Sequence, residues 1–172
     1  MNIIKYIIIF LIIILILIYF FVPYNFKLFN RVVWTKNKRI INFKLNDKNT
    51  DKEIFDIYSF SHITHGVLLC YLLSLFSFNK NKIVIISIII ELIWEFFENT
   101  DYIINKYRKK DEYNNYDGDS IVNIIGDLIS MIIGIIIYFK SKNFALIFII
   151  LLEIIFYPFN ANFIKLSIGS LL

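Results

Sequence analysis

The stretch that decides the fold is SIVNIIGDLISMIIGIIIYF, residues 120–139. A helix crosses a bilayer with about 20 mostly apolar residues, and this run has that length. Its polar and small residues recur at helical spacing on a stripe about 100° wide. The stripe comprises Asp119, Asn123, Gly126, Asp127, Ser130 and Gly134. Because ionisable groups are costly next to lipid, the stripe should face other helices.

Composition extends this interpretation to the whole chain. The 172 residues are 58% hydrophobic and contain only five glycines and two prolines, with a net charge of +4. A water-soluble core of this length does not need so much apolar surface, whereas a helical membrane bundle does. The single cysteine, Cys70, lies in an apolar stretch and is expected to be a small core residue.

Apolar runs predict an all-α integral membrane helical bundle with four to five transmembrane helices. The expected spans are residues 6–22, 60–78, 82–99, 120–139 and 143–157, separated by polar loops at 25–58 and 100–119. The last span is either a short crossing or a re-entrant segment. No small-residue cleavage site follows the first span, which favours a retained anchor. We therefore expect a single membrane domain over residues 1–172, in the bacterial inner membrane.

Three polar clusters interrupt the predicted helices: SHITHG at 61–66, ELIWEFFEN at 91–99 and DGDSIVNIIGD at 117–127. When the chain is followed through alternating crossings, all three fall on the same side of the membrane. The clusters should therefore meet in a polar funnel. Glu91 and Asp127 are expected about 12 Å deeper than the residues at the funnel mouth, at 1.5 Å of rise per residue.

The residue types in the funnel suit a metal site. The candidate ligands are His62, His65, Glu95 and Asp119, a set of imidazole and carboxylate groups that Zn, Mn or Fe would accept. The candidate catalytic residues are Glu98 as general base, Glu91 and Asp127. Asn99 and Asn123 complete the polar site. The leading hypothesis is metal-assisted chemistry on a lipid or lipid-linked envelope substrate, with no nucleic-acid partner.

Two other functions account for the same residues. Without a metal, the carboxylates form a proton relay, as in a small proton-coupled carrier that uses Glu91 and Asp127. In a structural scaffold, Asp119 and Asn99 cap helices, and the small residues of the stripe allow close helix packing. The standard enzyme signatures CxxC, HExxH, the P-loop and GxSxG are absent from the sequence. The basic run 106–110 either sets topology or recognises an anionic lipid headgroup.

The chain resembles a bacterial family of multi-pass membrane proteins, domain-of-unknown-function family 2585. The resemblance covers about residues 55–140 and rests on YSFSHITHG at 58–66, ELIWEFFEN at 91–99, Tyr107-Arg108, and YDGDSIVN at 116–123 with Asp127. After the last span, PFNAN at 158–162 departs from the family's Asp-Asn-rich motif. A more distant similarity to VanZ-like proteins rests on one His, one Glu and an Asp-x3-Asn-x2-Gly pattern, here at His65, Glu91 or Glu95, Asp119, Asn123 and Gly126. Neither resemblance implies a defined reaction.

Overall fold

The computed structural model describes residues 40–44, 51–109 and 116–157. These residues all belong to one compact unit, Val32–Leu172. The expected span at 6–22 lies outside the described residues, as do positions 25–39 and 45–50 of the expected loop 25–58.

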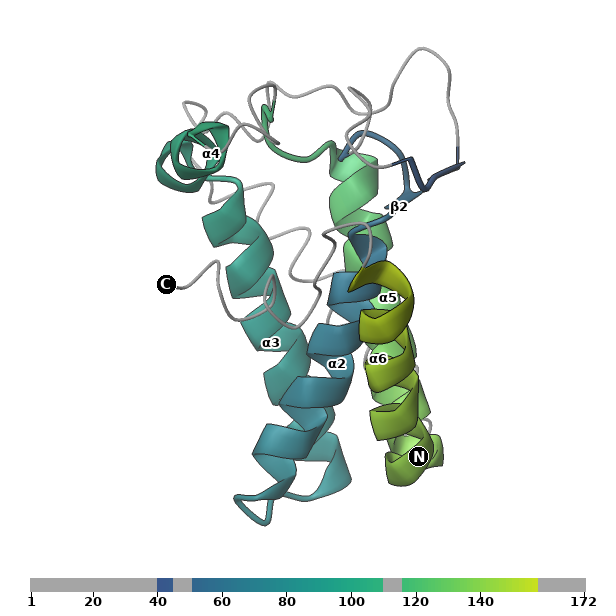
Figure 1. Cartoon of the computed structure of the whole chain (residues 1–172). Helices are drawn as coiled ribbons and strands as arrows, with labels where there is room; N and C mark the ends of the chain where they lie inside the picture. The colour runs from purple at the N-terminus through teal and green to yellow at the C-terminus, as the bar shows by residue number, and fades with distance from the viewer. Residues whose placement is uncertain (1–39, 45–50, 110–115, 158–172) are drawn as a thin grey trace. The chain divides into compact units, whose positions relative to one another are not determined.

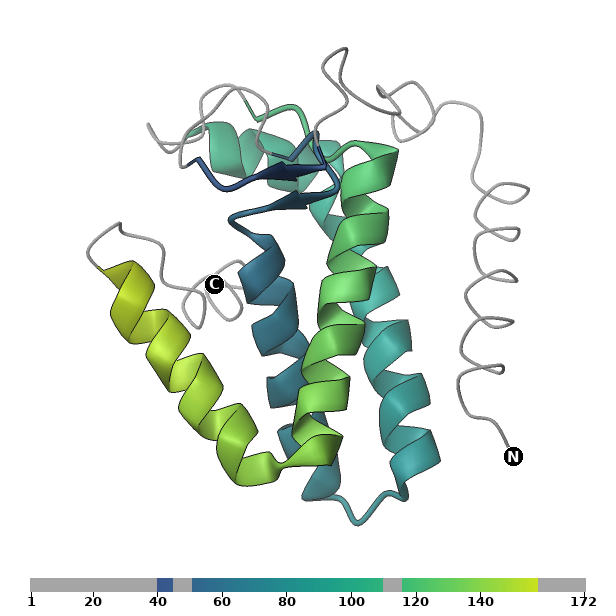
Figure 2. The same cartoon turned by 90° about the vertical axis from the view of Figure 1, so that its right-hand side faces the viewer.

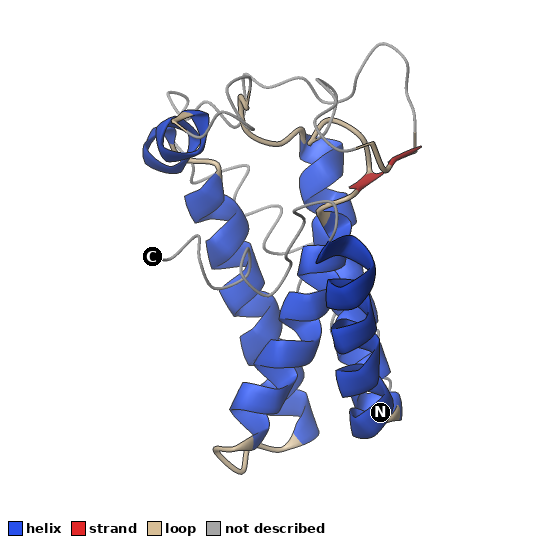
Figure 3. Cartoon of the chain, viewed as in Figure 1, coloured by secondary structure: helices blue, strands red, loops and turns tan. Residues whose placement is uncertain are grey.

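The described chain is mostly helical (Figure 3). In chain order its elements are β1 (Ile41–Asn42), β2 (Phe55–Asp56), α2 (Ser59–Ser74), α3 (Lys80–Glu98), α4 (Asp101–Arg108), α5 (Ile121–Lys140) and α6 (Lys142–Phe156). Helices α2, α3, α5 and α6 occupy the segments where the apolar runs predict helices. Side-chain oxygens of Asn79, Ser120 and Ser141 accept backbone N–H bonds at the starts of α3, α5 and α6. Asn99 caps the end of α3 as predicted, whereas Ser120 rather than Asp119 caps α5.

The stretch 100–119 is not entirely a loop, because it contains α4. The hydroxyl of Thr100 caps this helix, Asp101 lies in its first turn, and Lys106 and Arg108 lie in its last turn. These charges complement the helix dipole at both ends. The prediction of an uninterrupted polar loop was wrong here, since local capping stabilises a helix that hydropathy alone does not reveal.

Helices α2 and α5 lie side by side in both views of the structure (Figures 1 and 2). A Cβ atom added to Gly66 would lie 2.2 Å from the carbonyl oxygen of Met131, and one added to Gly134 would lie 2.1 Å from that of Ile63. Only a residue without a side chain allows the two backbones to approach this closely. The close helix packing predicted for the small-residue stripe is therefore confirmed at Gly134, whereas Gly126 packs against the backbone of Ile54, outside the helices.

The segment 51–58 packs on the first turns of α5, at the same end as α4 (Figure 2). Strands β1 and β2 pair in parallel, with Ile41 opposite Phe55. The Ser120 amide donates to the Asp51 carbonyl at 2.8 Å, and its hydroxyl donates to the Lys52 carbonyl at 3.0 Å. This part of the expected 25–58 loop is thus an ordered wall against the start of α5.

The described residues have an apolar core, yet many apolar side chains are exposed and many polar ones are buried. Many large apolar side chains are exposed, and they lie mainly on three helices: Ile85, Ile89, Ile93 and Phe96 on α3; Ile129, Ile133 and Ile136 on α5; Ile147, Ile150, Leu151 and Ile154 on α6. The buried set, by contrast, includes carboxylates, amides and an imidazole. Among the described residues, one helix, α5, is both long and apolar enough to cross a membrane.

Candidate functional site

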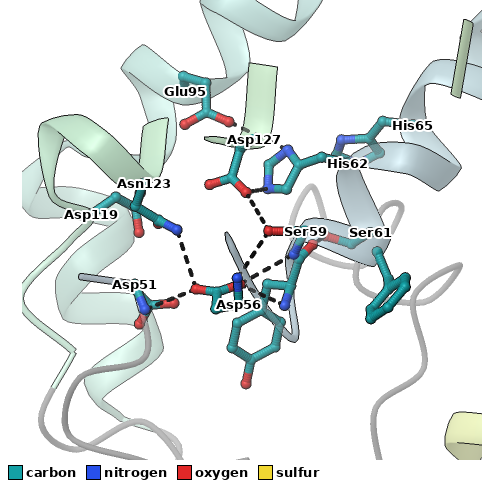
Figure 4. Close-up of polar contacts among 12 residues, drawn as sticks. Asp51, Asp56, Ser59, Ser61, His62, His65, Glu95, Asp119, Asn123 and Asp127 are labelled. Atoms are coloured by element: carbon teal, nitrogen blue, oxygen red, sulfur yellow. Dashed lines mark hydrogen bonds and ion pairs between the residues drawn. The ribbon is translucent and has the colours of Figure 1, made fainter. Parts of the chain in front are cut away.

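His62, on the second turn of α2, is the centre of the buried polar cluster (Figure 4). Its Nδ1 lies 2.6 Å from Oε1 of Glu91 and 3.4 Å from Oε1 of Glu95, both on α3. Its Nε2 lies 3.8 Å from Oδ1 of Asp127 on α5. At most 7% of any of these four side chains is exposed. Two carboxylates from α3 and one from α5 therefore surround one imidazole from α2, and all four groups are buried.

His65, one turn further along α2, lies near the other carboxylate oxygen of Glu91. Its Nδ1 lies 3.3 Å from Oε2 of Glu91, and its ring contacts Trp94 edge-on at 6.0 Å between centroids. Its side chain is 14% exposed, twice the value for His62. Glu91 thus lies between two imidazoles, because residues three apart on α2 point to the same side.

Two groups of side chains have the spacing of metal ligands. They are His62, His65 and Glu91, and His62, Glu95 and Asp127; within each group one potential ligand atom per residue lies within 4.8 Å of the others. Oε1 of Glu95 is buried without a hydrogen-bond partner among the described residues. A buried carboxylate oxygen in that state is costly unless a cation or proton satisfies it.

Asp119 lies outside both groups, in a separate network at the end of α3. Two hydrogen bonds join Asn99 and Asp119. Nδ2 of Asn99 donates to Oδ2 of Asp119 at 2.7 Å, and the backbone amide of Asp119 donates to Oδ1 of Asn99 at 2.9 Å. The Tyr116 hydroxyl donates to the Asp119 carboxylate at 3.1 Å. The sequence predicted both Asn99 and Asp119 as site residues, and the structure brings them together.

A second acidic network continues from Asp127 into the segment 51–58. The Ser59 hydroxyl donates a hydrogen bond to Oδ1 of Asp127 at 3.3 Å. It accepts a hydrogen bond from the backbone amide of Asp56 at 3.1 Å. The Asp56 carboxylate in turn accepts the backbone amides of Tyr58 at 2.7 Å and Asp51 at 2.9 Å. It also accepts Nδ2 of Asn123 at 3.3 Å. Asp56 therefore fixes the start of α2 to α5 beside the cluster.

Sequence reasoning missed Asp51 and Asp56, because acidic residues in a polar loop ordinarily face solvent. Burial is the main cause that raises the pKa of both carboxyls above the usual value for aspartate. The neighbouring charge of Asp119 raises the pKa of both further. A weak signal was present in the sequence: Asp56 precedes Ser59 by three residues at the start of a predicted helix, a spacing that favours side-chain bonds to free backbone amides.

A pocket opens beside the cluster on the side of α4. Its lining residues are Asp51, Tyr58, Ser61, His62, His65, Trp94, Glu98, Tyr107, Tyr116, Asp119, Asn123 and Asp127. Glu91 and Glu95 are not among them, so the pocket reaches the two histidines but leaves these glutamates behind its wall. Oε1 of Glu98 accepts the Tyr107 hydroxyl at 3.1 Å. Asp127, predicted at the deep level of the funnel, lines the pocket together with Glu98 and Asp119, whereas Glu91 does not, so the funnel with two levels stays a prediction.

The comparisons with known proteins identify a family. Residues 29–167 match the family described as "Protein of unknown function (DUF2585)". The chain belongs to this family. Its match extends beyond the region 55–140 on which the sequence resemblance rested, and it takes in every residue of the cluster and the pocket.

The chain is also similar to uncharacterised bacterial proteins. A UPF0314 protein of Brucella anthropi is 36% identical over 92 residues, which are 52% of this chain and 46% of the relative. A UPF0314 protein of Paracoccus denitrificans is 30% identical over 106 residues, 59% of this chain and 54% of the relative. The chain thus spans about half the length of these relatives. No solved structure matches the chain.

Proposed function

We propose that this protein is a metal-assisted membrane enzyme whose buried cluster binds one divalent cation, with Zn, Mn or Fe as candidates. The observation that carries the proposal is the double contact of His62: Nδ1 faces the Glu91 carboxylate at 2.6 Å, and Nε2 faces Asp127. A histidine that binds a metal typically donates its other ring N–H to a carboxylate, which fixes its tautomer and orientation. Glu91 would provide that orientation, which leaves Nε2, on the side of Asp127, available for the cation. Glu95, whose Oε1 lies 3.4 Å from Nδ1, would turn toward Nε2 when the cation binds.

The ligand set in this proposal is His62, Glu95 and Asp127. These residues offer one imidazole and two carboxylates with mutually close ligand atoms, and Glu95 carries the buried oxygen without a hydrogen bond. Three protein ligands with a remaining open position are the arrangement of catalytic metal sites. The proposal takes Asp127 in place of Asp119, since the Asp119 carboxylate accepts bonds from Asn99 and Tyr116.

The proposed location is the inner membrane, with several crossings. The exposed apolar faces of α3, α5 and α6 enclose a polar interior, as expected for helices that contact lipid. Lysines mark the end of the bundle opposite the pocket. Lys80 lies over the ring of Phe139 at 4.8 Å and Lys142 over that of Tyr138 at 5.4 Å. Paired lysines and aromatic rings at helix ends are typical of a membrane interface.

The proposed substrate is a lipid or a lipid-linked envelope molecule whose headgroup enters the pocket. Glu98 lines the pocket and is not in either ligand group, so it is the candidate general base for a metal-bound water. His65 also lines the pocket and could bind substrate oxygen.

A proton relay is the second candidate, and one specific observation favours it. A series of close polar contacts between titratable or hydroxyl groups runs from His65 through Glu91, His62 and Asp127 to Ser59, with separations of 3.3, 2.6, 3.8 and 3.3 Å. Such a series suits a proton-coupled carrier if no metal interrupts it.

Metal content separates the two candidates. The protein purified in detergent, treated with chelator and reloaded with Zn, Mn or Fe, is expected to retain close to one ion per chain by elemental mass spectrometry. His62→Ala and Asp127→Asn should each lose the ion, because each removes one proposed ligand.

Asp119→Asn is the matched control, since it removes a buried carboxylate outside both ligand groups. It should retain the ion. Helix content and gel-filtration profile show which variants remain folded. Absence of a stoichiometric ion from the folded wild-type protein after loading with all three metals would overturn the metal proposal and leave proton transfer.

A further inference from the structure

The pocket lining other than the buried cluster, which we call the outer pocket, has a chemical character distinct from that cluster. Four of its lining residues are aromatic, Tyr58, Trp94, Tyr107 and Tyr116, and three are carboxylates outside the proposed ligand set, Asp51, Glu98 and Asp119. Among the described residues that line the pocket, none is a lysine or an arginine. These described side chains therefore offer no fixed positive charge to a phosphate or carboxylate group.

The aromatic rings and the carboxylates are coupled in pairs. The Tyr107 hydroxyl donates to Glu98 at 3.1 Å, the Tyr116 hydroxyl donates to Asp119 at 3.1 Å, and the two tyrosine rings contact each other at 5.4 Å. Burial is the main cause that raises the pKa of Tyr116 well above its usual value, so this hydroxyl remains a donor. Glu98 and Asp119 are thus each held by the hydroxyl group of a tyrosine.

The basic groups nearby are directed at the backbone of one pocket wall. Nε of Arg108 donates to the Tyr116 carbonyl at 2.7 Å, and its guanidinium pairs with the Asp117 carboxylate. Nζ of Lys52 donates to the Gly118 carbonyl at 2.6 Å. These cations hold the segment 116–118 in place from outside the pocket, and they leave its interior acidic and aromatic.

We propose that this outer pocket binds an ammonium group, either that of an amine-bearing lipid headgroup or that of a free amine. Aromatic faces attract a cation through the negative charge above each ring, and preformed carboxylates supply its counter-charge. The inference rests on the proposed function in that it names the substrate class for that site. The ammonium contacts Glu98, Asp119 and the tyrosine rings, and the metal-binding cluster lies deeper.

Binding can be measured through Trp94. The chain has two tryptophans, so Trp34→Phe leaves Trp94, on the pocket wall, as the only indole reporter. The chelator-treated and the metal-loaded full-length protein are each titrated in nanodiscs with phosphatidylethanolamine against a phosphatidylglycerol background, and separately with soluble ethanolamine in detergent. We expect a saturable change in Trp94 emission with phosphatidylethanolamine in both metal states. A response to ethanolamine as well would place the recognition in the amine itself, whereas a response to the lipid alone would place it in the headgroup together with its lipid.

In the same Trp34→Phe background, Glu98→Gln removes one carboxylate charge and should weaken binding about tenfold. Glu153→Gln makes the same change on α6, outside the pocket lining, and should leave binding unchanged. An equal response to phosphatidylglycerol alone, no response to either amine, or unchanged affinity in a folded Glu98→Gln protein would overturn the proposal. Because the metal content is measured independently, failure of ammonium binding is distinguishable from failure of the metal site.

Discussion

The contact between α2 and α5 has two halves that are held in different ways. In one half, Gly66 and Gly134 bring the two backbones together so closely that neither position has room for a methyl group. In the other half, Ser59 and His62 face Asp127 through polar contacts of 3.3 and 3.8 Å. The glycine half fixes the spacing of the helices, and the polar half uses that spacing to hold ionisable groups together.

This difference has a physical consequence. Packing of glycine against a backbone carbonyl is insensitive to pH and to ions, whereas a buried imidazole among carboxylates depends on both. The polar half is therefore the part of the contact that can change state. Four substitutions, taken from the largest expected effect to the smallest, test whether the two halves behave differently.

His62→Ala is expected to have the largest effect on stability. It leaves Glu91, Glu95 and Asp127 buried without their shared imidazole, and breaking a buried ion pair typically costs about 3–5 kcal/mol. The free energy of unfolding, measured by circular dichroism during denaturation of the detergent-solubilised protein in chelator, should fall by that amount. His65→Ala should cost less, because its side chain is more exposed and contacts Glu91 alone among these acids. Equal losses in the two variants would contradict the central position of His62.

Gly134→Ala should destabilise the protein by about 1–3 kcal/mol, the usual cost of overpacking. The added methyl would meet the backbone carbonyl of Ile63, which cannot rotate away as a side chain can. Alanine is otherwise the better helix former by about 1 kcal/mol, so a loss has to come from the clash. Ile133→Ala, at the adjacent exposed position of α5, is the control, with an expected change within about 0.5 kcal/mol. The loss from Gly134→Ala should be the same at every pH tested.

Asp51→Asn tests the pH dependence of the acidic network that adjoins the polar half through Asp56 and Ser59. Burial raises the pKa of Asp51 above that of the unfolded chain, so its contribution to stability is fully present below the unfolded value of 3.8 and is lost as pH rises through the folded value. Asparagine removes this loss and tolerates the positive φ of 69° at this position. The variant should therefore be more stable than the wild type near pH 8, by less than the effect of Gly134→Ala. Its advantage should vanish below about pH 4, near the unfolded pKa of aspartate. Parallel stability curves for the two proteins from pH 4 to 8 would contradict the raised pKa.

Asp117→Asn should have the smallest effect, below about 1 kcal/mol, because exposed ion pairs contribute little. The side chains of Arg108 and Asp117 are 41% and 69% exposed. Thermal unfolding at low and high salt is the measurement, and the difference between variant and wild type should shrink as salt rises. A loss comparable to that of His62→Ala would mean that the pocket wall, and not the buried cluster, dominates stability at this end.

Much of this arrangement could be predicted from the helical spacing of polar residues. On α5, Asn123, Asp127 and Gly134 recur on one stripe, and all three are buried. On α3, Glu91 and Glu95 are buried and Glu98 lines the pocket. Their inward position could be predicted because an ionisable or polar side chain is costly next to lipid, so such residues are expected to face other helices.

Other features could not be predicted because their causes are not periodic. Helix α4 depends on the Thr100 cap and on charges at its ends, which outweigh a polar composition that resembles a loop. Asp56 is buried because the segment 51–58 packs on α5, and its carboxylate is satisfied there by the nearby backbone amides of Asp51, Tyr58 and Ser59. Such features depend on tertiary packing and on local hydrogen bonds, and neither has a periodic signal in the sequence.

The sequence by itself determined which residue types face inward and which helices carry them, because the cost of exposing a charge to apolar surroundings acts on each helix separately. Only the tertiary structure decided which of those residues meet. It grouped His62 with Glu91, Glu95 and Asp127, and it placed Asp119 with Asn99 and Tyr116. The reason is geometric: the close approach of α2 and α5 at Gly66 and Gly134 brings Asp127 to His62, and the packing of α3 against α2 brings Glu91 and Glu95 to the same imidazole.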